Sequence, residues 1–255
     1  MRTIKWLIRI LVATMMLVQA AMLAAAAEDL SAWQKRMPIT FSGYTPPGGG
    51  ALTNFPVLVI LSNTTAGTGF NYADFQSPPY GDLRFGAADK TTPLDFEVEK
   101  WDTNGNSYAW VQVPLLTDTN TRIYALWRKS GVEVPACTTN GAVWTNNYIS
   151  VWHLGETNGN LVAATSNRYA LSGNAGVTRG ATGAAAGACS FNGSSGCAEM
   201  ANEAALNPTQ VTVEAWAKLG TWSSDWHMLV TKGFDGACVP YNLSLAPNPT
   251  GSQSQ

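Results

Sequence analysis

The sequence has little charge and few of the residues that catalytic and metal sites use. Only 13% of its 255 residues are charged and the net charge is -2, so we expect no nucleic-acid partner. Two histidines, His153 and His227, are too few for a zinc site built from histidines. No Gly-x-Ser-x-Gly elbow is present, and the glycine-rich stretch 173–187 lacks the Lys-Ser or Lys-Thr ending of a phosphate loop. These absences favour a non-enzymatic protein without a cofactor.

After residue 27 no run is apolar and long enough to span a membrane. Before it, Arg2, Lys5 and Arg9 precede the apolar run 10–23, and four alanines end at Ala27. This order predicts a secretory signal peptide over residues 1–27, cut near Ala27. The alternative is an uncleaved anchor, the one membrane contact that we expect, since residues 6–27 are just long enough to span a bilayer. Both interpretations place the remaining chain outside the cytoplasm, in the periplasm, on the cell surface or secreted.

The chain has only four cysteines, an even number that suits export and permits two disulfides in any of three connectivities. Their spacing lacks the paired C-x-x-C form of a zinc site. Cys189 and Cys197 would then staple neighbouring strands, or all four would simply be buried. The candidates are Cys137, Cys189, Cys197 and Cys238.

Helical periodicity is almost absent, and short segments instead alternate with a period of two between clusters of Gly, Pro, Asn and Asp. This pattern predicts an all-β fold of two antiparallel β-sandwich domains. Residues 55–61 are nearly all apolar and are expected inside a sandwich. The Asn-Gly pair in residues 102–106 predicts a tight hairpin. Further strands are expected at 211–218 and 227–231, with Trp216 and Trp152 in the core.

The strand rhythm stops between residues 130 and 147, which contain Gly131, Pro135 and Gly141. We therefore place a domain boundary there, with one domain at 28–140 and a second at 148–255. Residues 175–188, rich in Gly and Ala, are expected to form a long loop.

Five blocks in the first domain resemble, in order, the bacterial domain of unknown function DUF2341. They are 55–59 (FPVLV), 81–85 (GDLRF), 92–102 (TPLDFEVEKWD), 109–114 (AWVQVP) and 121–124 (TRIY). Three later blocks are similar to the first half of a laminin-G-like, concanavalin A-like jelly roll. These are 151–154 (VWHL), 188–193 (ACSFNG) and 211–218 (VTVEAWAK).

The resemblance implies an exported pair of β-sandwiches, the second a truncated jelly roll, since a full one needs further strands. Such pairs occur in large bacterial envelope proteins. Some of these proteins continue into a proton-channel module similar to the ExbB and TolQ biopolymer-transport family. The chain would then be a fragment of a larger protein.

Glu97 and Glu99 alternate on one face of a predicted strand, beside Trp101. Two carboxyl groups about 5 Å apart would suit a retaining glycosidase. The same residues lie opposite the apolar Phe96 and Val98, which is typical of an ordinary solvated strand face. We favour that interpretation over catalysis.

Trp222 and Trp226 flank a predicted turn that contains Asp225. Exposed rings there would stack on sugars, which makes this pair, with Asp225, the candidate ligand-binding site. The alternative is that both rings cap the core. Laminin-G-like domains often bind calcium through loop oxygens, and Asp235 is the weak candidate for such a metal site.

Three functions follow from these observations. The first is an exported binding or adhesion protein that contacts a glycan or an envelope or extracellular protein surface. The second is the periplasmic structural part of an ExbB/TolQ-type transport protein. The third is a glycoside hydrolase that uses Glu97 and Glu99. The sequence leaves the ligand, the disulfide pairing and the oligomeric state open.

Overall fold

The computed structural model describes residues 28–46, 48, 50–64, 69–221, 225–233 and 241–246. Within these ranges the strands form antiparallel sheets, and the helices are 3-10 turns of three residues, which confirms the all-β prediction. No helix in the described ranges is long and apolar enough to cross a membrane. The predicted signal peptide, residues 1–27, lies outside them.

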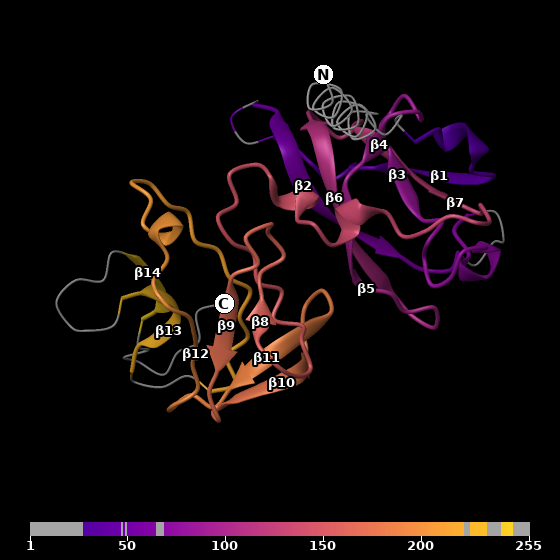
Figure 1. The fold of residues 1–255 in the computed structure, drawn as a ribbon. Coiled ribbons are helices and arrows are strands. Elements are labelled where there is room, and N and C mark those ends of the chain that lie inside the picture. Colours follow the sequence, from indigo (N-terminus) through magenta and orange to yellow (C-terminus); the bar gives the residue numbers. More distant parts are fainter. Residues whose placement is uncertain are drawn as a thin grey trace, which may run out of the picture.

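The first half of the chain forms two sheets that pack face to face (Figure 1). One sheet has the order β1 (Lys35–Thr40), β7 (Arg122–Trp127), β3 (Arg84–Gly86), β4 (Pro93–Leu94). The other has the order β2 (Leu52–Leu61), β6 (Ser107–Leu116), β5 (Phe96–Lys100). Two short helices precede β1 and β3: η1 (Leu30–Ala32) and η3 (Tyr72–Asp74).

The core of this sandwich follows from the alternation in its strands. In β6 the side chains of Ala109, Val111 and Val113 are buried, whereas those between them point to the opposite face. Phe85 of β3 and Phe96 of β5 pack edge to face against each other in the same core. The predicted hairpin between β5 and β6 is present, but it is not tight, because residues 101–106 separate the two strands.

One strand prediction needs correction. β2 is not wholly interior, because Val59 and Leu61 are buried while Ile60 between them is exposed. In the described residues β2 pairs only with β6 and forms an edge of its sheet, and the outer face at Ile60 is left uncovered.

The second half forms three small sheets. They are β12 (Ala198–Glu199), β9 (Ala170–Gly173) and β8 (Leu161–Val162); β10 (Val177–Thr182) with β11 (Gly187–Phe191); and β13 (His227–Lys232) with β14 (Tyr241–Leu245). A further turn, η6 (Ala204–Leu206), precedes β13.

Two predictions for this half are wrong. Residues 175–188 contain β10 and the start of β11 instead of a loop, and Gly183 in the turn between them brings its backbone close to that of Gly187. Residues 211–218 form no strand, and Trp216 is exposed instead of buried. Trp152 is half-buried, and its indole donates a hydrogen bond to the carbonyl of Tyr169 at 3.1 Å.

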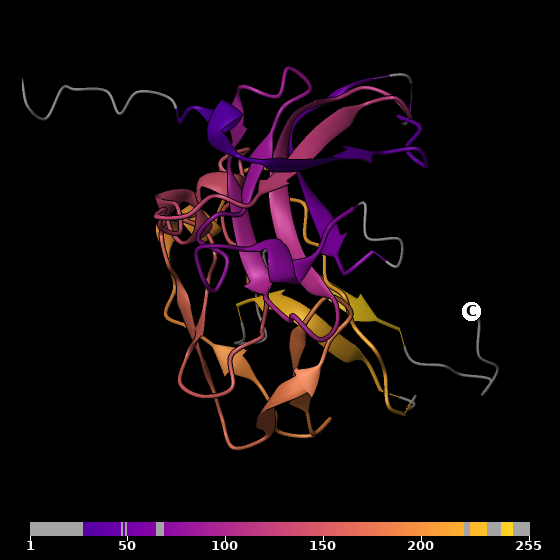
Figure 2. The ribbon, with the colours of Figure 1, turned by 90° about the vertical axis from the view of Figure 1, so that its right-hand side faces the viewer.

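A short connection holds the two halves against each other. η4 (Ala136–Thr138) and η5 (Ala142–Trp144) lie across the outer face of β5 and β6, and Gln112 of β6 donates hydrogen bonds to the carbonyls of Ala142 and Val143. In both views, β8–β14 lie below the first sandwich (Figures 1 and 2). The outer face of the three-stranded sheet is therefore a contact surface and not open to water at this point.

Candidate functional site

Glu97 and Glu99 lie on β5, on the sheet face that points away from the core. Phe96 pairs with Val111 and Glu97 with Trp110 across the β5–β6 ladder. The register shifts between Val98 and Lys100, so that β5 has one residue more than β6 at this point. Glu99 is the residue at this bulge, and bulges redirect side chains. The bulge explains how Glu99 reaches the same partners as Glu97.

Two indole groups hold the carboxylates in place. The Nε1 of Trp144, from η5, donates a hydrogen bond to Oε2 of Glu97 at 2.6 Å. The Nε1 of Trp110, from β6, donates to Oε2 of Glu99, also at 2.6 Å. Hydrogen bonds to a charged acceptor are shorter and stronger than neutral ones. Each carboxylate is therefore fixed by one tryptophan.

His153 completes the cluster from the segment that follows η5. Its Nε2 lies 3.4 Å from Oε1 of Glu97, and its Nδ1 lies 3.7 Å from Oε2 of Glu99. The imidazole stacks on Trp110, with ring centres 5.9 Å apart and planes at 17°, and its centre is 5.6 Å from that of Trp144. The ring thus lies between two carboxylates and two indoles.

The net effect of this environment is to raise the pKa of His153 above its ordinary value. Burial, the largest single influence, acts in the opposite direction, because it disfavours the charged imidazolium. The contact with Glu97 and the negative charges of Glu99, Glu97 and Glu156 together outweigh it. The cluster therefore favours a positively charged His153.

The arrangement leaves the two acids little room for catalysis. Only 18% of the Glu97 side chain and 7% of the Glu99 side chain are exposed. A glycosidase needs its acid and its nucleophile open to the substrate. The favoured interpretation of a solvated strand face needs correction as well, because η5 and His153 cover both side chains.

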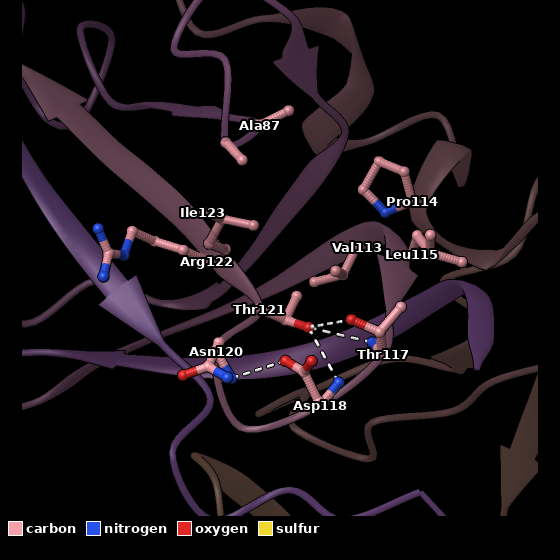
Figure 3. Close-up of a pocket in the computed structure, with 11 residues that line it drawn as sticks. Ala87, Val113, Pro114, Leu115, Thr117, Asp118, Asn120, Thr121, Arg122 and Ile123 are labelled. Atoms are coloured by element: carbon pink, nitrogen blue, oxygen red, sulfur yellow. Dashed lines mark hydrogen bonds between the residues drawn. The ribbon is translucent and has the colours of Figure 1, made fainter. Parts of the chain in front are cut away.

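A shallow groove of about 450 Å³ lies elsewhere on the first sandwich, between the end of β6 and the start of β7. Thr121 Oγ1 accepts hydrogen bonds from the backbone N–H groups of Thr117 and Asp118, and it shares one with the Thr117 hydroxyl (Figure 3). Asp118 in turn accepts the N–H of Asn120. The polar groups of this turn mostly satisfy one another, and Glu97 and Glu99 do not line the groove.

The aromatic candidates of the second half are exposed where the structure describes them. Trp226, directly before β13, is 61% exposed, and Asp225 beside it is also exposed. Trp216 is 87% exposed, more than any other large apolar side chain in the described ranges. Trp222 lies outside the described residues.

Three of the four candidate cysteines lie in the described parts of the chain, and none of the three forms a disulfide there. Cys137, on η4, packs against the first core, Cys189 lies on β11 and Cys197 follows it, and all three are free. Burial raises the pKa of the Cys137 thiol. Cys238 and Asp235 lie outside the described residues. Among the residues described, no group of three acidic, histidine or cysteine side chains could hold a metal ion.

Sequence reasoning identified the two glutamates but not the group they belong to. Trp110, Trp144 and His153 come from a strand, a 3-10 turn and an irregular segment, and no local motif links them. One local pattern could have pointed to this group. Trp110 and Gln112 alternate with buried residues on β6, and a large aromatic side chain on the outer face of a strand indicates that this face of the sheet is also covered.

Comparison with known proteins identifies only part of the first half. Neither a curated protein nor a solved structure is significantly similar to the chain. Four of the five blocks that suggested a family, from residue 81 to residue 124, lie within a matched region that also contains Glu97, Glu99, Trp110 and Trp144. That region, residues 79–145, matches the family model of the domain of unknown function DUF2341, which confirms this part of the resemblance.

Proposed function

We propose that the chain is an exported, non-enzymatic binding or adhesion protein whose second half contacts carbohydrate through exposed tryptophan rings. The exposure of Trp216 and Trp226 carries the proposal. Tryptophan is highly buried on average, so two exposed indoles in one half of a chain need an explanation. An indole offers a flat apolar face for the C–H groups of a sugar and an N–H donor for its hydroxyls.

The geometry of the first half supports the non-enzymatic part of this proposal. Glu97 and Glu99 are engaged by indole N–H groups and covered by His153. The groove that the first sandwich does present is lined by neither acid. A glycoside hydrolase that uses these two residues is therefore the less favoured function.

The test is a glycan-array screen of the purified chain, followed by binding measurements on Trp216→Ala and Trp226→Ala. Loss of either ring is expected to weaken binding to a retained glycan about tenfold, which corresponds to about 1.4 kcal/mol. Met228→Ala is the matched control, because Met228 is a large exposed apolar side chain on β13 without a ring.

Three outcomes would contradict the proposal. The first is a screen in which no glycan is retained. The second is binding that Met228→Ala weakens as much as the tryptophan variants do. The third is release of reducing sugar from a polysaccharide panel that Glu97→Gln abolishes, which would instead support the hydrolase.

A structural role is the second candidate, and the packed junction favours it. Hydrogen bonds from Gln112 to η5 and from Asn146 to the carbonyl of Thr53 tie the connection to the first sandwich. A stiff pair of domains would suit a periplasmic spacer in an ExbB/TolQ-type transport protein. An in-frame continuation of the gene into long apolar helices, together with no glycan binding, would favour this candidate over the first.

A further inference from the structure

The carboxylates of Glu97 and Glu99 and the indoles of Trp110 and Trp144 form one small enclosure, called the cage below. We infer that the cage is a cation-binding site, that its ligand in this chain is the imidazolium of His153, and that this charge fastens the second half to the first. All four cage residues lie within the region that matches DUF2341, whereas His153 follows it. The cage is thus a surface by which that region holds the segment after it.

The two nitrogen atoms of His153 carry the main argument. One faces Glu97 at 3.4 Å and the other faces Glu99 at 3.7 Å. A neutral imidazole has one N–H group and one lone pair, so either tautomer would point a lone pair at a carboxylate. Only the imidazolium places a positive charge and no lone pair beside both acids. Nε2 is buried and has no well-aligned hydrogen bond, so its attraction to Glu97 depends on the charge.

The indoles add a second, independent preference for a cation. The face of Trp110 is stacked on the imidazole ring at 5.9 Å, and Trp144 is at 5.6 Å. Both distances are within the range of about 6 Å over which an aromatic ring attracts a cation. The same indoles direct their N–H groups at Glu99 and Glu97, which keeps the carboxylates aimed at the ligand.

The charged groups of the described residues that act on the pKa of His153 are all acidic. β5 contributes Glu97 and Glu99, the segment of His153 itself contributes Glu156, and β6 and η5 contribute the two indoles. Because the folded-state pKa of His153 is raised, its contribution to stability is fully present below the pKa of an unfolded histidine. It is lost as the pH rises through the raised value. The contact is therefore tight in acid and loosens toward alkaline pH.

The first test is a proton NMR titration of the two histidines of the full chain, with His227→Gln used to assign His153. The pKa of His153 is expected above the ordinary value of about 6.5. Glu97→Gln and Glu99→Gln should each lower it, whereas Glu199→Gln, at an exposed carboxylate on β12, should leave it unchanged. A value at or below 6.5, or one that the cage variants do not move, would overturn the inference.

The second test replaces the ligand with free imidazole in slightly acidic buffer, where imidazole is largely protonated. His153→Ala should lower the midpoint of thermal unfolding, and added imidazole should restore part of the loss. Added imidazole should not raise the unfolding midpoint of wild type. It should also not raise that of a triple variant that carries His153→Ala, Glu97→Gln and Glu99→Gln. An equal shift in all three proteins, or no shift in any, would show that the cage does not select a cation. If His153→Ala does not fold, His153→Gln and the NMR titration decide the question.

Discussion

Asp82 shows how single buried side chains organise the first sandwich. It is fully buried, and its carboxylate accepts hydrogen bonds from the backbone N–H groups of Gln76, Ser77, Arg128 and Lys129 at 2.9 to 3.1 Å. Its side chain therefore joins the loop before β3 to the end of β7.

Asp82→Asn is expected to lower the free energy of unfolding by at least about 2 kcal/mol. Asparagine has one acceptor oxygen, so its amide group would face backbone donors that then have no partner. The measurement is urea denaturation at neutral pH. Asp118→Asn is the control, because Asp118 is exposed and accepts the single N–H of Asn120. Equal effects from both variants would contradict this account of Asp82.

At the residue scale, the sequence predicted which acids share a strand face but not what covers them. The alternation of Glu97 and Glu99 is a local pattern and can be read from β5 alone. Their contacts with Trp144 and His153 depend on how a later segment folds back. The alternation of the two acids with Phe96 and Val98 would look the same whether the acidic face meets solvent or a covering segment. The predicted solvated face was therefore wrong.

At the scale of elements, the turn before η5 determines how closely the halves approach. Gly141 has a positive φ of 81°, and a Cβ there would lie 2.4 Å from the backbone nitrogen of Ser166. The neighbouring atoms belong to the backbone and are not able to rotate away. Only glycine fits this position, because it combines a left-handed conformation with a close backbone contact.

Gly141→Ala is expected to destabilise the chain by at least about 2 kcal/mol and to loosen residues 164–166. Gly131→Ala is a matched control, because Gly131 also has a positive φ, of 70°, but nothing lies within 4 Å of its Cβ position. That control should cost about 1 kcal/mol from backbone strain alone. Urea denaturation measures both variants, and an equal loss would mean that the contact with Ser166 contributes nothing.

Element prediction succeeded where alternation coincided with pairing. The hairpin between β5 and β6 was predicted from its Asn-Gly pair, and the side chains of β6 alternate between buried and less buried from Ser107 to Val113. The segment 211–218 has a similar alternation but forms no strand, because a strand also needs a partner for its backbone groups. The strands β10 and β11 were missed because they contain few large apolar side chains, so no apolar alternation marks their antiparallel pairing.

On the scale of the whole molecule, the two halves differ in their cores. Most of the fully buried large side chains belong to the first sandwich, including Trp33, Phe70 and Trp127. In the second half, Leu161 and Val177 are among the few buried apolar side chains. The second half therefore depends on contacts with the first, and the cage around His153 is one of them.

The central claim is that the charge on His153 holds the halves together, and hydrogen exchange tests it most directly. The measurement is the ratio of amide protection of residues 151–166 in wild type to that in His153→Gln. Both proteins are measured at the same pH, so that intrinsic exchange cancels, and the ratio is determined at a series of pH values. The ratio is predicted to be largest in acid and to fall toward one as the pH rises through the pKa of His153. A ratio of one throughout, or a ratio that does not change with pH, would contradict the account.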